Sequence, residues 1–187
     1  MNYTKILIYE EVINNYYRIE KACEKKSKSS AKEAYQNVYF LDNKAIALDG
    51  HIVAILDLTK ASNLNISDLE TLNGKALDSK SFELVCKGWI LSVKDTGITV
   101  KSKRKEEVFY EYVNDSIPLL SEFMKKISVE QPVEGISGMR FYSSYMKKVC
   151  EVLGDSSCPM YFHGNGNIIK ITDENIGLEI VFYHNCV

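Results

Sequence analysis

The three histidines are the first candidates for chemistry, because an imidazole titrates near neutral pH and can bind metal ions. His51 follows an Asp-Gly pair that predicts a turn, while His163 and His184 belong to two separate strand-like segments. None has another histidine at the short spacing of a metal site, and no Cys-x-x-Cys pair or nucleophile elbow is present. We therefore expect no metal, no cofactor and no catalytic centre. An enzyme that uses His51 or His163 is kept only as a third alternative.

A stripe of basic residues on a predicted helix is the next candidate. Within residues 10–26, Arg18, Lys21 and Lys25 are spaced i, i+3, i+7 and therefore share one side of the helix. Such a stripe can bind phosphate groups, or it can be a solvated surface on which Glu20 supplies an ion-pair partner. The residues alone leave both interpretations open.

The composition is typical of a soluble globular protein. The chain has 187 residues, of which 45% are hydrophobic and 26% are charged, and its formal net charge is −2. That charge does not require a polyanionic partner, although it is compatible with a local basic face. Five cysteines without metal-ligand spacing, and no signal-peptide pattern, predict reduced thiols in the cytoplasm. No apolar run reaches the length of a membrane span, so we expect no membrane partner.

The elements that must position these residues repeat along the chain. Residues 77–86 return as residues 141–150 at a constant offset of 64 residues, and similar strand-like segments follow each copy. Cys86 and Cys150 fall at matching positions, so we expect both to be small core residues. A repeated helix followed by strands indicates stacked supersecondary units, because one such unit cannot bury its own apolar face.

Three units with the order strand, helix and three strands are predicted. In the second unit, Asp78 or Ser79 caps the helix and Gly88 ends it in a left-handed conformation. Residues 60–73 are polar and predict a connection, and residues 115–134 predict a linker. The elements of the three units are predicted at residues 3–9, 10–26 and 38–59, then at 78–88, 89–93, 97–102 and 107–113, and finally at 143–153, 161–163, 168–172 and 178–183.

This plan resembles that of the DNA sliding clamps, and local motifs are similar to those of the bacterial DNA polymerase III beta subunit. Residues 47–54 resemble the clamp stretch ATDGHRLA, residues 116–119 its F-P-D segment, and residues 140–145 the G-F-N opening of its last half-domain. Residues 180–187 align in length with the terminal strand of the family. The resemblance implies an α+β fold of repeated β-α-β-β-β half-domains, with antiparallel sheets and with the helices on one face.

The resemblance also implies a domain organisation. Residues 1–125 would form a clamp-like domain with half-domains at 1–60 and 75–113, and residues 136–187 would add a further half-domain. Rings of the family contain twelve half-domains, so four copies of a chain with three could supply a ring, while a reduced relative without a ring is the alternative. We expect a homo-oligomer, because an unpaired third unit leaves a sheet edge open.

Two binding surfaces are implied by the same resemblance. Clamp helices present lysine and arginine to duplex phosphates without reading the base sequence, and a separate apolar cleft binds short peptides of client proteins. The implied DNA-binding residues are Arg18, Lys21, Lys25, Lys147 and Lys148. The implied peptide-binding residues are Leu48, Gly50, His51, Ile52, Val53, Pro118, Phe123, Val181, Tyr183, His184, Asn185 and Cys186. The apolar members of the second set could equally be ordinary sheet core.

Two hypotheses about function follow. The first is a non-enzymatic, cytoplasmic clamp-like protein of replication that holds duplex DNA, in a truncated bacterial or mobile-element form, with polymerase or other client peptides as further partners. The alternative is a protein-interaction module that retains the clamp fold and has lost DNA binding. The resemblance covers the clamp's middle domain and the second half of its last domain, so the first domain and half of the last have no counterpart here. These missing half-domains and the near-neutral net charge favour the alternative, while the basic stripe favours the first.

Overall fold

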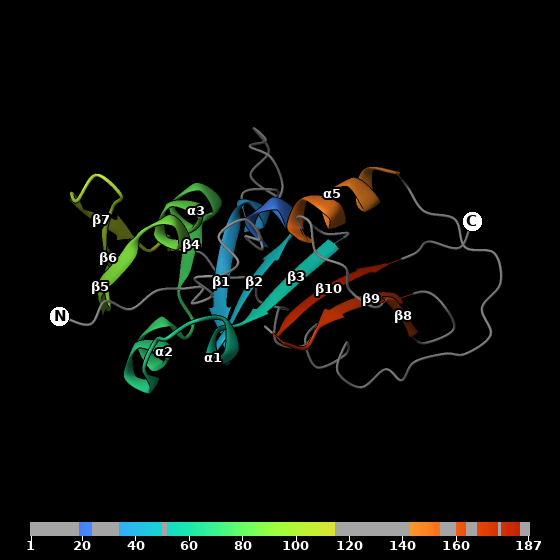
Figure 1. Cartoon of the computed structure of the whole chain (residues 1–187), viewed down its shortest axis with the longest axis horizontal. Helices are drawn as coiled ribbons and strands as arrows, with labels where there is room; N and C mark the ends of the chain where they lie inside the picture. Colours follow the sequence, from blue (N-terminus) through green and yellow to red (C-terminus); the bar gives the residue numbers. More distant parts are fainter. Residues whose placement is uncertain are drawn as a thin grey trace.

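The structure is a computed structural model of the whole chain (Figure 1). It describes residues 19–23, 34–49, 52–114, 143–153, 160–163, 168–175 and 177–183. The expected strand at residues 3–9 and most of the expected helix at residues 10–26 lie outside them. Of that helix, a 3-10 turn is described, η1 at Ile19–Ala22.

Three consecutive antiparallel strands form the centre of the first sheet. They are β1 (Asn37–Leu41), β2 (Lys44–Leu48) and β3 (Ile52–Asp57), as the predicted meander requires. Leu41 pairs with Lys44, so Asp42 and Asn43 form a two-residue hairpin loop, and both have positive φ angles of 50° and 62°. Short polar residues tolerate this left-handed conformation, which matches the twist of a hairpin.

Strands from distant parts of the chain extend this sheet to seven strands. The order is β4-β1-β2-β3-β10-β9-β8, where β4 is Ala76–Asp78, β8 is Met160–His163, β9 is Ile168–Asp173 and β10 is Leu178–Tyr183. Antiparallel pairing of β3 with β10 joins the first predicted unit to the third, as Figure 1 shows. Whether the chain divides into the two predicted domains stays a prediction.

The second sheet is a separate antiparallel meander. It consists of β5 (Trp89–Lys94), β6 (Gly97–Lys101) and β7 (Glu107–Glu111), at the positions that the sequence predicts. A shift in register between Ile90 and Ser92 marks a bulge in β5. Ile90, Ile98 and Val100 are buried on one face of this sheet. Successive side chains of a strand alternate between the two faces, so the residues next to them point away from the core.

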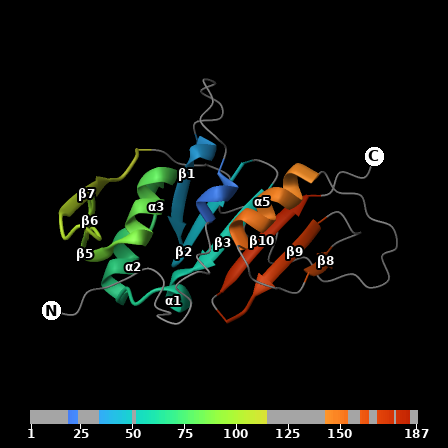
Figure 2. The same ribbon diagram turned by 45° about the horizontal axis from the view of Figure 1, so that its top comes forward.

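Helices cover one face of the larger sheet. The longest are α3 (Ser79–Lys87) and α5 (Ser143–Leu153), which begin 64 residues apart, as the repeat predicts. Figure 2 shows α5 beside η1 over β3 and β10, with α3 over β1. None of the described helices has the length and apolar character needed to cross a lipid bilayer. The shorter elements are η3 (Ala34–Gln36), α1 (Leu58–Ala61) and α2 (Ile66–Leu72).

Three expectations about local structure were wrong. Residues 60–73 are not a plain connection, because they contain the second half of α1 and all of α2, whose Leu69 and Leu72 are buried. Gly88 ends α3 in an extended conformation (φ −106°, ψ −171°) and not in a left-handed one. Cys86 is buried as expected, but Cys150 is exposed, because α5 turns Val149 and Val152 to the core instead.

Both faces of the first sheet are apolar in its central strands. Val38, Phe40 and Ile52 belong to the larger core on the helix side, which also takes in the helices and the second sheet. Tyr39, Ile46 and their neighbours form a smaller cluster on the opposite face. Continuous burial of this kind explains why β3 is a run of five apolar residues without alternation.

Candidate nucleic-acid interface

A cleft of about 680 Å³ opens between η1, α3 and α5 on the helix side of the sheet. Four lysines and four carboxylates are among its lining residues. The lysines are Lys21, Lys80, Lys147 and Lys148. The carboxylates are Glu20, Asp78, Glu83 and Glu151. Formal charges therefore cancel over the cleft, although lysines from all three helices reach it.

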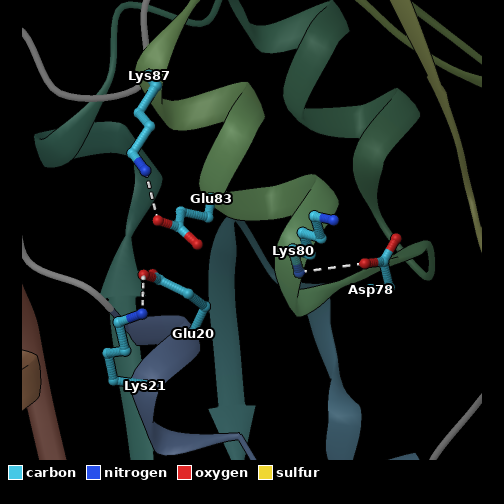
Figure 3. A network of polar contacts seen from close by, with 6 residues as sticks. All are labelled: Glu20, Lys21, Asp78, Lys80, Glu83 and Lys87. Carbon is cyan, nitrogen blue, oxygen red and sulfur yellow. Dashed lines mark hydrogen bonds and ion pairs between the residues drawn. The ribbon is translucent and has the colours of Figure 1, made fainter. Parts of the chain in front are cut away.

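Local capping explains why α3 presents its first turn to this cleft. Asp78 precedes the helix in an extended conformation, and its Oδ1 accepts hydrogen bonds from the backbone N–H groups of Lys80 and Ser81, both at 3.1 Å. The carboxylate thereby satisfies two amides that have no partner within the helix. Phe82, Val85 and Cys86 anchor the opposite side of α3 in the core, which leaves Lys80 exposed (Figure 3).

Ion pairs engage part of the basic charge on this face. Lys21 Nζ lies 3.9 Å from Oε1 of the buried Glu20, and Lys87 on α3 pairs with Glu83 one turn earlier (Figure 3). Lys80 and Lys147 are the more exposed lysines of the cleft. Because an ion pair competes with phosphate for the same ammonium group, exposed lysines are the better candidates for contact with DNA.

Lys148 makes the most buried ion pair of the described residues. Its ammonium group donates a hydrogen bond to Oδ2 of Asp49 within the ion pair, and the Asp49 side chain is only 5% exposed. The other oxygen of that carboxylate accepts a hydrogen bond from the Ile52 backbone N–H at 2.9 Å, and Asp49 N donates to Ile52 O at 3.2 Å. Asp49 thus closes the turn between β2 and β3 and anchors α5 to it.

The thiol of Cys23, which lines the cleft, is unreactive at neutral pH. It is buried and donates a hydrogen bond to the Asn37 carbonyl oxygen at 3.4 Å. Burial, and secondarily the nearby Glu20 carboxylate, raises the pKa of this thiol to about 12. The nucleophilic thiolate is therefore negligible at neutral pH, and nothing in the geometry suggests catalysis by Cys23. Among the described residues, no group of three or more metal-binding side chains is placed to hold an ion.

Solved structures with the same arrangement of sheets and helices are bacterial sliding clamps. The DNA polymerase sliding clamp of Bacillus subtilis superposes with a TM-score of 0.58 over 91% of this chain, at 13% sequence identity. The fold is that of a bacterial sliding clamp. The DnaN sliding clamp, or DNA polymerase III subunit beta, of Bartonella birtlesii gives 0.58 at 15% identity over the same share. The beta chain of Streptococcus pneumoniae gives 0.55 at 13% identity, also over 91%.

The likeness to the clamps is one of fold. No protein-family model matches the sequence, and no curated protein matches it either. The chain spans 62% of the Bacillus subtilis clamp and 64% of the Bartonella birtlesii clamp, so it corresponds to less than two thirds of their length. The predicted fold class is confirmed by the comparison, including its antiparallel sheets.

The clamp fold brings three of the five predicted DNA-binding residues to one place. Lys21, Lys147 and Lys148 all line the cleft, although they come from two segments more than a hundred residues apart. Arg18 and Lys25 lie outside the described residues. Sequence reasoning missed Lys80, which is exposed in the first turn of α3 and lines the cleft. The available signal was its place two residues after the capping Asp78, in the first turn of a repeated helix.

The structure also brings together some residues of the predicted peptide site. Leu48 pairs with Val53, and Val53 pairs with Val181, so the three form one row across β2, β3 and β10. These side chains and that of Ile52 are buried in this structure, as core residues would be. Tyr183 ends β10. Gly50, His51, Pro118, Phe123, His184, Asn185 and Cys186 lie outside the described residues, so the peptide site stays a prediction.

Proposed function

We propose that this protein is a non-enzymatic, clamp-type DNA-binding protein of replication that holds duplex DNA against its helix layer without reading the base sequence. The observation that carries the proposal is the cleft on a sliding-clamp fold, where η1, α3 and α5 each contribute a lysine. Lysine ammonium groups arranged along a surface can follow a phosphate backbone, because their attraction does not depend on the bases.

The strength of this contact is set by the number of free ammonium groups. Lys80 and Lys147 are exposed, while Lys148 is held by Asp49 and Lys21 lies near Glu20. Two to four phosphate contacts per chain would give weak binding with a modest salt dependence, which suits a protein that must move along DNA. Assembly of several copies would multiply these contacts, and we include a homo-oligomer, ring-shaped or partial, in the proposal.

A second candidate function is a protein-interaction module that keeps the clamp fold without DNA binding. The balance of four lysines and four carboxylates in the cleft favours this candidate, as does the ion pair that engages Lys148. Under this proposal the predicted peptide site near the β2–β3 turn and the end of β10 is the active surface, and the helix layer is a solvated face.

Duplex binding by charge-reversal variants separates the two candidates. Fluorescence anisotropy of a labelled duplex at low salt should show binding by the wild type and a loss of about tenfold or more in the Lys80→Glu/Lys147→Glu variant. The Lys44→Glu/Lys60→Glu variant changes the net charge equally at positions that do not line the cleft, and it should bind nearly as the wild type does. Absence of duplex binding by the wild type would overturn the DNA proposal and leave the interaction module.

A further inference from the structure

Two aromatic side chains stand exposed on the outer face of the second sheet. Trp89 on β5 is 41% exposed and Phe109 on β7 is 49% exposed, whereas Ile90, Ile98 and Val100 are buried on the other face. α2 and α3 contact β5. Tryptophan is highly buried on average, and exposed apolar side chains that gather on one face mark candidate interaction surfaces. This is also the only tryptophan of the chain.

Strand register places both aromatic residues on the same face. Trp89 pairs with Lys101 on β6, and Phe109 pairs with Thr99, two residues along the same strand. Paired residues share a face of the sheet, as do residues two apart in one strand. β5 and β7 flank β6 and the two positions are offset by two residues along it, so they lie roughly 12 Å apart across the sheet. One ring therefore does not cover the other.

The Phe109 ring is fixed in place by the glycine beside it. A Cβ atom on Gly97 would meet the Phe109 ring at 2.6 Å from Cζ and would also meet the Tyr110 carbonyl oxygen. The ring therefore lies against the backbone of β6 where a side chain is absent, which leaves its other face open. An aromatic group that is already ordered loses little entropy when a planar ligand stacks on it.

Basic residues gather at one end of this aromatic face. The β6–β7 turn carries the exposed Lys103, Arg104 and Lys105, and Lys101 lies next to Trp89 at the same end. Hydrogen bonds from Ser102 N to Glu106 O at 2.8 Å and from Lys105 N to Ser102 O at 2.9 Å order the turn. Carboxylates share this face: Glu107 pairs with Lys101 and, with Glu111, flanks Phe109 along β7, and the exposed Glu106 follows the basic turn. Four basic side chains against the carboxylates of Glu106 and Glu107 leave an excess of positive charge at the end of the sheet that holds Trp89.

We propose that the outer face of β5-β6-β7 binds single-stranded nucleic acid, with bases stacked on Trp89 and Phe109 and phosphates beside Lys101 and the turn at residues 103–105. Exposed aromatic rings next to cations are the combination that single-strand binding requires, because every base has a planar face and every linkage a negative charge. Duplex DNA keeps its bases stacked internally and gains nothing from such rings. This surface is distinct from the helix layer.

Tryptophan fluorescence tests the proposal directly, since Trp89 is the only source of that signal. Titration with a short oligo-dT strand at low salt should quench the emission in a saturable manner. In anisotropy measurements with labelled oligo-dT, Trp89→Ala should weaken binding about fivefold to a hundredfold, and Trp89→Phe should restore most of it. Ile66→Ala is the matched control, because Ile66 is 76% exposed on α2 and belongs to none of the three strands of this sheet.

Three outcomes would overturn the proposal: no quenching and no anisotropy change with the wild type, equal binding by Trp89→Ala and the wild type, or quenching by a poly-glutamate peptide but not by oligo-dT. The last would assign the face to an acidic protein partner. The Lys80→Glu/Lys147→Glu variant should bind oligo-dT as the wild type does. A failure of the duplex-binding proposal can therefore be distinguished from a failure of the single-strand proposal.

Discussion

Lys148 on α5 is ion-paired with Asp49, the residue that closes the turn between β2 and β3. The pair joins the first and third units of the chain on the helix side of the sheet, next to the β3–β10 junction that joins them within it. A residue that the clamp resemblance assigned to DNA therefore also has a structural role. Any effect of Lys148 substitutions on DNA binding must be read together with their effect on stability.

Removal of the Lys148 ammonium group should destabilise the fold. In Lys148→Met the buried Asp49 carboxylate loses its cation, and we expect the free energy of unfolding to fall by about 1–3 kcal/mol, between the values typical of exposed and fully buried pairs. Urea denaturation measures this change. Lys147→Met is the control, because Lys147 is exposed on the same helix and should change stability by less than about 0.5 kcal/mol. Equal effects of both variants would contradict the structural role of the pair.

The capping box of α2 should contribute measurably to stability. Asn65 Oδ1 accepts a hydrogen bond from Asp68 N at 2.9 Å, and Asp68 Oδ2 accepts one from Asn65 N at 3.4 Å. Asn65→Ala should lower the free energy of unfolding by about 1 kcal/mol. Glu70→Ala, in the exposed part of the same helix, should have little effect in the same denaturation experiment. A neutral Asn65→Ala would show that α2 does not depend on this cap.

Stability should decline in alkaline solution because of the Cys23 thiol. Its pKa is about 12 in the folded protein against 9.0 for an ordinary thiol, so above pH 9 the unfolded chain loses this proton first. Folding then becomes less favourable by at most about 1.4 kcal/mol per pH unit from this group. The contribution is complete below pH 9 and disappears towards pH 12. Unfolding free energies at pH 8 and pH 10 should differ less in Cys23→Ala than in the wild type, and an unchanged pH slope would refute the assignment.

A side chain at Gly97 should disturb the second sheet. The added methyl group of Gly97→Ala would collide with the Phe109 ring and the Tyr110 carbonyl oxygen, so either the strands or the ring must move. We expect a loss of about 1–3 kcal/mol in the free energy of unfolding and weaker oligo-dT binding. Thr96→Ala, at the exposed neighbouring turn position, serves as the control. Wild-type stability of Gly97→Ala would mean that Phe109 is not held against this glycine.

Local patterns predicted much of the fold. The apolar segment at 178–183 coincides with β10, and the 64-residue repeat located α3 and α5, because helix caps and strand alternation are local properties. The sequence did not predict α2, because residues 60–73 are mostly polar. Within that helix only Leu69 and Leu72 are buried. Gly88 is extended because it lies against Val100 and the backbone of Lys101, a contact that the local sequence does not contain.

The candidate site was less predictable than the fold. Lys148 and Asp49 are 99 residues apart in the sequence, so their pairing depends on how the first and third units join. That junction brings Lys147 to the cleft, and the pairing of β4 with β1 brings Lys80, although only Lys147 belonged to the predicted set. Charge on a single helix face predicts that a basic surface exists. It does not predict which carboxylates from other elements will neutralise it.

The salt dependence of duplex binding tests the central proposal most directly. We expect the logarithm of the wild-type association constant to fall linearly with the logarithm of salt concentration, with a slope of about −2 to −4 for two to four phosphate contacts. The Lys80→Glu/Lys147→Glu variant should flatten that slope by about two, while Lys44→Glu/Lys60→Glu should preserve it. A slope near zero, or one that the Lys80→Glu/Lys147→Glu variant leaves unchanged, would contradict binding of duplex DNA by the helix layer.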